Sequence, residues 1–400
     1  MKTLNRIFNL VITKISKISK PQKKFLAELF EVIFSAYGKG NFLNLARYSK
    51  FNECTFRRNF DKFFDWLSFN FELISLYNSK IAELIGAIDC SFISKSGKKT
   101  YGLDTFWCGI ASKALKGLEI SALAIINVTN SFAWMLDVVQ TPPCLPSKEG
   151  AENEYTRINF YLEQFLDCLP KLKNILYFVA DGFYAKKKVI DTFISEGKHL
   201  IVKLRSDANL RFLFNGDPKK GKGAKKKYAG KVYFSDLKNW FFKGIDYKYN
   251  HLHIYYQTLN SIQFKRNLKV VLVLNTNNQK YILLASTDIE QSARQIVEYY
   301  QLRFQIEFLF RDAKQFTGLN DCQARSEDKL DFHFNASFAA LNLSNAIMIE
   351  ENSTSLNNIV RKAYNENFLN FILVKLSLKP NFNVNDPIFD EIITFGLMRD

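Results

Sequence analysis

The stretch with the clearest chemical content is residues 299–314, YYQLRFQIEFLFRDAK, where a few polar residues lie among aromatic and aliphatic ones. At about 100° per residue, a helix here places five polar side chains within an arc of roughly 80° on one face. They are Tyr300, Arg303, Glu307, Arg311 and Lys314. The other faces are mostly apolar, so the pattern predicts a largely buried helix with a narrow charged strip.

Two interpretations of this strip are open from the helix alone. Arg303, Glu307 and Arg311 are successive i, i+4 neighbours, and a ladder of salt bridges would contribute about 0.2–0.5 kcal/mol per pair. Alternatively, Glu307 is a metal ligand and the basic residues bind an anionic substrate. The second interpretation requires other carboxylates that join Glu307 at one site.

Two aspartates are the best candidates for those carboxylates. Asp89 ends the apolar run ELIGAID and Asp181 ends NILYFVAD, and both runs are typical of buried strands. Ligand sites in α/β sheets favour the carboxyl ends of strands. Lysines follow both aspartates, which suits a site for Mg²⁺ and phosphate: Lys95, Lys98 and Lys99 after the first, and Lys186, Lys187 and Lys188 after the second.

Each aspartate by itself has a simpler explanation. An Asp at a strand end often caps the following turn, and Asp104, Asp137 and Asp312 have comparable local settings. The order Asp, Asp and helix-borne Glu is the stronger observation. Three carboxylates repel one another unless cations neutralise them, so such a site would depend on metal ions.

The elements that position these residues begin with a helical region, residues 1–80. We predict a short helix through Leu45, a turn near 50–53, and a second helix from Thr55 through Leu67, the outline of a helix-turn-helix. Arg57 and Arg58 would lie in the first turns of the second helix, where they could reach DNA. The region holds 14 basic and 6 acidic residues, although a helical bundle with a basic surface would show the same excess.

The remainder predicts an α/β protein. Residues 81–205 read as a β-meander followed by alternating helices and strands, and residues 286–350 carry the Glu307 helix and the apolar helix FHFNASFAALNLSNAIMI. Residues 206–285 look inserted, with strands KVYFSDL, HLHIYYQTL, KVVLVLN and KYILLAS around a lysine-rich run that we predict to be a mobile loop. Residues 351–400 read as short helical pieces and turns.

Composition narrows the class of partner. Lys and Arg exceed Asp and Glu by 55 − 39 = 16, which favours a polyanion such as nucleic acid, or an anionic membrane surface. No apolar run is long enough to span a bilayer, and we predict no signal peptide. The six cysteines and four histidines show no zinc-ligand spacing, so free thiols in a reducing cytoplasm are the simplest expectation.

Together these motifs resemble bacterial insertion-sequence transposases of the DDE class, in the subgroup with a Y-x2-R-x3-E-x6-K signature. Tyr300, Arg303, Glu307 and Lys314 meet that spacing at every position. AIDCSFISKSGKKTYG, FVADGFYAKK and RFQIEFLFRDAKQFTGLNDCQARS also resemble the blocks around the acids of that subgroup. The likeness covers roughly residues 85–345.

The resemblance implies an RNase H-like catalytic core with a strand-rich insertion between the second Asp and the Glu. It implies that Asp89, Asp181 and Glu307 hold two Mg²⁺ ions, which Mn²⁺ can replace. It further implies that the signature residues Tyr300, Arg303 and Lys314 contact DNA phosphates. Arg311 shares the helix face of Lys314 and is a further candidate, as are Lys95, Lys98, Arg57 and Arg58.

The expected function is cut-and-paste transposition by a nucleoid-associated cytoplasmic enzyme. The implied steps are hydrolytic nicking at terminal inverted repeats and transesterification into target DNA, in some members through a DNA hairpin. A homodimer would hold two ends, with residues 351–400 as a dimer surface. Alternatives are an inactive or domesticated transposase that only binds DNA, an RNase H-fold nuclease without strand transfer and, more remotely, a membrane-surface protein.

Overall fold

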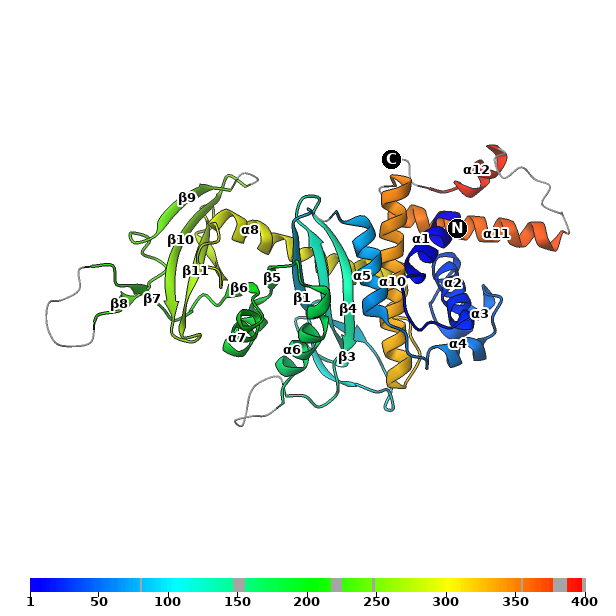
Figure 1. Cartoon of the computed structure of the whole chain (residues 1–400), viewed down its shortest axis with the longest axis horizontal. Helices are drawn as coiled ribbons and strands as arrows, with labels where there is room; N and C mark the ends of the chain where they lie inside the picture. The colour runs from blue at the N-terminus through cyan, green and yellow to red at the C-terminus, as the bar shows by residue number, and fades with distance from the viewer. Residues whose placement is uncertain are drawn as a thin grey trace.

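The computed structural model describes residues 1–79, 81–146, 155–216, 225–246, 249–353, 355–376 and 387–397. Its centre is a twelve-stranded mixed sheet with strand order β2-β3-β1-β5-β6-β12-β11-β10-β7-β8; β4 pairs with β3, and β9 pairs with β10. In Figure 1 the N-terminal helices lie at one end of the molecule and strands β7–β11 at the other, with β1, β3 and β4 between them.

The middle of the sheet has the predicted meander followed by parallel strands. Strands β1 (Leu84–Ser94), β3 (Lys113–Asn127) and β4 (Phe132–Gln140) pair antiparallel, and β2 (Asp104–Cys108) adds a hairpin strand. Strands β5 (Tyr177–Ala180) and β6 (His199–Leu204) run parallel to β1, reached through α6 (Arg157–Cys168) and α7 (Lys187–Ser195). This mixed α/β arrangement is consistent with an RNase H-like core.

Residues 206–285 extend the same sheet. Strand β12 (Lys280–Ser286) pairs with β6, and beyond it lie β11 (Arg266–Asn275), β10 (Leu252–Ser261), β7 (Leu210–Leu213), β8 (Tyr228–Lys231) and β9 (Phe241–Ile245). The predicted strand at 231–237 is wrong, because β8 ends at Lys231 and the chain then turns. Part of the lysine-rich run, residues 217–224, lies outside the described residues.

The N-terminal region is helical, as predicted, with five helices: α1 (Lys2–Ile12), α2 (Lys20–Ser35), α3 (Phe42–Arg47), α4 (Glu53–Asn59) and α5 (Trp66–Tyr77). The predicted second helix of the helix-turn-helix is too long. It ends at Asn59, and Asp65 starts a new helix because its carboxylate accepts the Ser68 N–H at 2.9 Å.

After the sheet come α8 (Ala293–Leu302), α9 (Phe304–Phe316) and α10 (Glu327–Glu351), followed by α11 (Leu356–Lys375) and α12 (Pro387–Ile393). Helix α10 is apolar on nearly every side and packs against α1, α5, α9 and β4. The expectation of short pieces after residue 350 is wrong for α11, which has 20 residues. Within the part of the chain described, no helix is long and apolar enough to cross a bilayer.

Candidate active site

Asp89 and Asp181 occupy equivalent positions on neighbouring parallel strands. The β1–β5 pairing ends with Ile88 opposite Ala180, so each aspartate is the next residue along its strand. The prediction that Asp89 ends its strand is wrong, since β1 continues to Ser94 against β3. Asp89 instead lies where the parallel neighbour stops, which leaves its carboxylate beside that of Asp181.

Arg303 links Glu307 to Asp89 by hydrogen bonds to both carboxylates. Arg303 Nη1 donates to Asp89 Oδ2 at 3.0 Å, and Arg303 Nη2 donates to Glu307 Oε1 at 2.7 Å. The Arg303 side chain is 9% exposed, whereas the Glu307 side chain is 45% exposed. A strand residue and a helix residue far apart in sequence are thus joined by a partly buried, charge-assisted bridge.

The single helix predicted for residues 299–314 is interrupted at Arg303. This residue closes α8 and precedes α9, and hydrogen bonds from Arg303 N to Tyr300 O and from Ile306 N to Arg303 O tighten the chain there. Arg303 keeps helical dihedrals, so its i, i+4 pair with Glu307 survives. The second rung of the proposed salt-bridge ladder does not form; Arg311 Nε pairs with Asp312 at 2.8 Å.

The electrostatics show surplus negative charge around Asp89. Burial and the nearby Asp181 raise the pKa of Asp89 to about 7, against the lowering effect of Arg303. Burial also raises the pKa of Asp181. Burial alone would lower the pKa of Arg303, but Asp89, Tyr300 and Glu307 outweigh it and the net shift is upward. The site therefore attracts cations, and the Arg303 guanidinium is the cation that contacts its carboxylates.

The other residues of the signature also make internal contacts. Lys314 Nζ donates to Ser91 Oγ at 2.8 Å and to the Phe92 carbonyl at 2.9 Å, which fastens α9 to β1 just beyond Asp89. Tyr300 is buried, with its ring centroid 5.8 Å from the Arg303 guanidinium carbon. Sequence reasoning missed Ser91, and no motif marks it, because its role depends on the crossing of α9 over β1.

The other residues predicted to contact DNA differ in their exposure and in their position in the fold. Lys95 Nζ donates to the Cys322 carbonyl, and burial lowers its pKa. Lys98, Arg57, Arg58 and Arg311 are exposed, although Arg57 pairs with Glu53 in the first turn of α4. The structure therefore gathers Asp89, Asp181, Arg303 and Glu307, and leaves the two arginines of α4 in a separate region.

The competing acids have other partners. Asp104 lies 3.7 Å from the Arg157 guanidinium, and the half-buried Asp137 accepts a hydrogen bond from Gln164 at 2.8 Å. Asp312 pairs with its neighbour Arg311 at 2.8 Å. Asp181 does cap the following turn, since its Oδ1 accepts the Phe183 N–H at 2.8 Å, but this uses one oxygen and leaves the other for further contacts.

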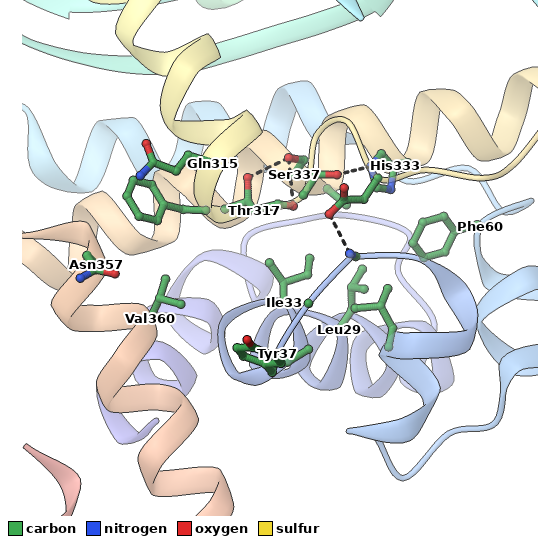
Figure 2. A pocket seen from close by; sticks show the side chains of 18 residues that line it. Leu29, Ile33, Tyr37, Phe60, Gln315, Thr317, His333, Ser337, Asn357 and Val360 are labelled. Atoms are coloured by element: carbon green, nitrogen blue, oxygen red, sulfur yellow. Dashed lines mark hydrogen bonds between the residues drawn. The ribbon is translucent and has the colours of Figure 1, made fainter. Parts of the chain in front are cut away.

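A pocket of about 370 Å³ lies away from the acids, among α2, α10 and the turn after α9 (Figure 2). Hydrogen bonds inside it join Asp321 to the Gly40 N–H at 2.8 Å and Thr317 to Ser337 at 2.8 Å. The first bond connects the N-terminal region to the turn after α9, and the second connects the end of α9 to α10. The pocket contains none of the predicted metal ligands.

Two family models match overlapping parts of this chain. A family model described as "Transposase DDE domain" matches residues 159–343, and one described as "DDE superfamily endonuclease" matches residues 65–241. The first range includes Asp181 and Glu307, and the second includes Asp89 and Asp181. The matches support a DDE transposase family. They support a transposase or nuclease role, and the DDE endonuclease superfamily generally uses divalent metals such as Mg²⁺.

Other comparisons add little. No curated protein matches this sequence. Two solved structures of Ciona intestinalis endonuclease V with inosine-containing DNA match at 14% identity, with TM-scores of 0.30 and 0.28. Each match covers 63% of this chain, and 97% and 96% of the respective endonuclease chains. Likeness at that level carries no argument about this protein.

The donor set fits a hard divalent cation, since it consists of carboxylate oxygens. Among the described residues, however, no three His, Cys, Asp or Glu side chains converge closely enough to hold a metal ion as arranged. The contacts give a reason, because the Arg303 guanidinium lies against both Asp89 and Glu307. The Arg303 Nε is buried without a hydrogen-bond partner among the same residues, so this position of the arginine is only partly satisfied.

Proposed function

We propose that this protein is a DNA transposase that cuts and joins transposon ends, with Asp89, Asp181 and Glu307 as ligands of two Mg²⁺ ions. The observation that carries the proposal is the register Ile88–Ala180, which sets Asp89 beside Asp181, together with the Arg303 bridge from Asp89 to Glu307. Carboxylates forced together in a partly buried site gain most from divalent cations.

Held by Asp89, Asp181 and Glu307, two divalent ions would activate the attacking oxygen and stabilise the leaving oxygen at a phosphodiester. Residues of the chain itself position these carboxylates. Lys314 holds α9 against β1 and so fixes Glu307 relative to Asp89. Tyr300 packs against Arg303, and the half-exposed Phe304 and Phe308 on α9 border the site.

The DNA would be held by three parts of the chain. We assign recognition of terminal inverted repeats to residues 1–80, where Arg57 and Arg58 are exposed on α4. We assign the catalytic core to residues 81–205 and 286–350, where Lys95, Lys98 and Arg311 would contact phosphates. Residues 206–285 form the strand-rich insertion, whose exposed Lys225, Lys226 and Lys227 would bind the DNA backbone.

Residues 351–400 are proposed as the dimer surface. Four apolar residues on the outer half of α11 and just after it, Phe368, Phe371, Val374 and Leu376, are each at least half exposed. Such a row of apolar side chains is typical of an interaction surface. A homodimer would hold two transposon ends and a target duplex, acting in the bacterial cytoplasm at the nucleoid.

The test is cleavage of labelled DNA taken from the two flanks of the protein's own coding sequence, with Mg²⁺ or Mn²⁺. Wild type is expected to nick the flank at one position and to join the freed 3′ end to a second duplex. A hairpin product would show that the second strand is cut by the first. Glu307→Gln is expected to bind the same DNA without cutting it.

The alternatives predict different products. Binding without cutting by wild type would indicate an inactive, DNA-binding descendant of a transposase. Cutting without joining would indicate a nuclease. Equal cutting by wild type and Glu307→Gln would remove Glu307 from the site.

A further inference from the structure

Arg303 lies where two of the proposed metal ligands converge. It is the residue between α8 and α9, and its two terminal nitrogens bond to different carboxylates, Asp89 at 3.0 Å and Glu307 at 2.7 Å. A carboxylate oxygen that accepts a guanidinium N–H at these distances has a lone pair already engaged. Asp89 Oδ1 is engaged as well, since it accepts the Cys90 N–H at 2.8 Å, and a divalent ion shared by Asp89 and Glu307 would have to take the place that the guanidinium fills between them.

We infer that the Arg303 guanidinium and the divalent ions compete for Asp89 and Glu307, so that Arg303 has to leave these carboxylates before the metal site is complete. This inference rests on the proposed function, because it takes Asp89 and Glu307 as metal ligands. It adds that Arg303 is a positioning residue: it holds the two carboxylates together in the absence of metal and sets how readily metal replaces it.

The contacts of Arg303 favour such an exchange. Its Nε is buried without a hydrogen-bond partner among the described residues, and a buried donor without a partner costs free energy. Its guanidinium carbon lies 4.8 Å from the ring centroid of Phe304, which is 48% exposed. The arginine can therefore turn outward across an aromatic face toward solvent while it keeps a favourable contact.

DNA would be the natural partner for the displaced arginine. A phosphate accepts two N–H bonds from a guanidinium in the geometry that a carboxylate uses. If Arg303 moves from Asp89 and Glu307 to a phosphate, DNA binding opens the metal site, and by linkage metal binding strengthens DNA binding by the same factor. The metal site would then assemble at a lower concentration of divalent ions when DNA is bound.

The first test measures Mn²⁺ binding to the full-length protein without DNA, by electron paramagnetic resonance of the free ion. Arg303→Gln is expected to bind Mn²⁺ roughly tenfold more tightly than wild type, because it removes the competing charge. Arg303→Lys keeps the charge and is expected to remain near wild type. The matched control is Arg205→Gln, an exposed arginine whose guanidinium pairs with Asp207, and it is expected to leave Mn²⁺ affinity unchanged.

A second measurement needs no substitution at Arg303. In wild type, modification of Arg303 by phenylglyoxal, followed by mass spectrometry, is expected to be slow in EDTA and several-fold faster at saturating Mn²⁺. Continued protection of Arg303 while Mn²⁺ is bound would overturn the inference. So would unchanged or weaker Mn²⁺ affinity in a folded Arg303→Gln protein.

Glu307→Gln separates this inference from the proposed function. If Glu307→Gln weakens Mn²⁺ binding and Arg303→Gln does not strengthen it, the metal site stands and the competition is wrong. If Glu307→Gln has no effect on Mn²⁺ binding in either background, the proposed site itself fails, and the competition fails with it. Tighter Mn²⁺ binding by Arg303→Gln that is lost on adding Glu307→Gln supports both.

Discussion

Residues 84–204 and residues 206–285 are adjacent parts of one sheet, joined where β6 pairs with β12, yet they carry charge differently. The first part has 14 basic and 12 acidic residues, a net charge of +2; the second has 15 basic and 4 acidic residues, a net charge of +11, and no glutamate. More than half of the protein's +16 thus arises from 80 residues.

The placement of the charges differs as well. In residues 84–204, Asp89, Glu119, Asp137 and Asp181 are largely buried, and burial raises the pKa of each. In residues 206–285, Lys225, Lys226 and Lys227 are exposed. Buried acids suit cation binding and chemistry, whereas exposed cations suit contact with a polyanion. The comparison teaches that cutting and holding DNA would be separable properties of this chain.

The largest expected effect comes from Asp181→Asn. It should reduce metal-dependent cleavage on the order of 10³-fold, since it removes a ligand from the charge-stabilising metal site. DNA affinity measured in EDTA should change little, because residues 206–285 are untouched and neither protein then binds metal. Cleavage rate and dissociation constant measured on the same duplex check this. A parallel loss of both would show that the two parts are not separable.

The second largest expected effect is a loss of stability in Gly86→Ala. An added Cβ would lie 2.2 Å from the Phe178 ring on β5, and such overpacking costs about 1–3 kcal/mol of unfolding free energy. Gly109→Ala, whose Cβ would meet nothing within 4 Å, is the matched control in urea unfolding. If Gly86→Ala proves as stable as the control, packing of Phe178 on Gly86 does not fix the register that aligns Asp89 with Asp181.

Replacing Lys225, Lys226 and Lys227 together by Gln should weaken DNA binding roughly tenfold at moderate salt and make the salt dependence shallower by about 2–3 in log–log slope. Cleavage at saturating DNA should stay at the wild-type rate. The matched control is Lys113→Gln with Lys116→Gln, two exposed lysines of β3, measured by fluorescence anisotropy. An equal loss of affinity in the control would assign no special role to residues 206–285.

The smallest expected effect tests whether a carboxyl group outside the candidate site, that of Asp331, also has a raised pKa. Burial, followed by repulsion from Asp137, raises the pKa of Asp331 on α10 from 3.8 to about 7. Between pH 4 and 7 the folded protein then binds a proton that the unfolded chain lacks, so unfolding free energy falls as pH rises through this window. Asp331→Asn should be more stable than wild type at pH 8, on the order of 1 kcal/mol, and equal to it near pH 4. Thermal unfolding at both pH values checks this, and a stability gain that is the same at both would contradict the shift.

Much of the arrangement could be predicted from local patterns. The apolar runs that became β1, β3, β4, β5 and β6 are long or rich in β-branched residues. The helix signature located Glu307 and Arg303 in one strip. Several boundaries could not be predicted, because they depend on neighbours: β1 runs past Asp89 since β3 pairs with it to Ser94, and the short β7, β8 and β9 depend on the strands that they pair with in the sheet.

The contacts within the candidate site were the least predictable part. A sequence pattern shows that Arg303 and Lys314 share a face with Glu307, but not that Arg303 reaches Asp89 or that Lys314 reaches Ser91. Both contacts depend on how α9 crosses β1. The two interpretations of the charged strip, a salt-bridge ladder and a DNA-binding face, are therefore not exclusive. Arg303 forms a salt bridge with Glu307 in the structure, and we propose that it exchanges this contact for a DNA phosphate.

The most direct test of the central claim is anomalous diffraction from crystals of the full-length protein with Mn²⁺. We expect Mn²⁺ peaks within ligand distance of Asp89 and Asp181, with Glu307 as a further ligand, and loss of at least one peak in Glu307→Gln. Peaks confined to other acids, or an unchanged pattern in Glu307→Gln, would contradict the assignment of these three residues as the metal site.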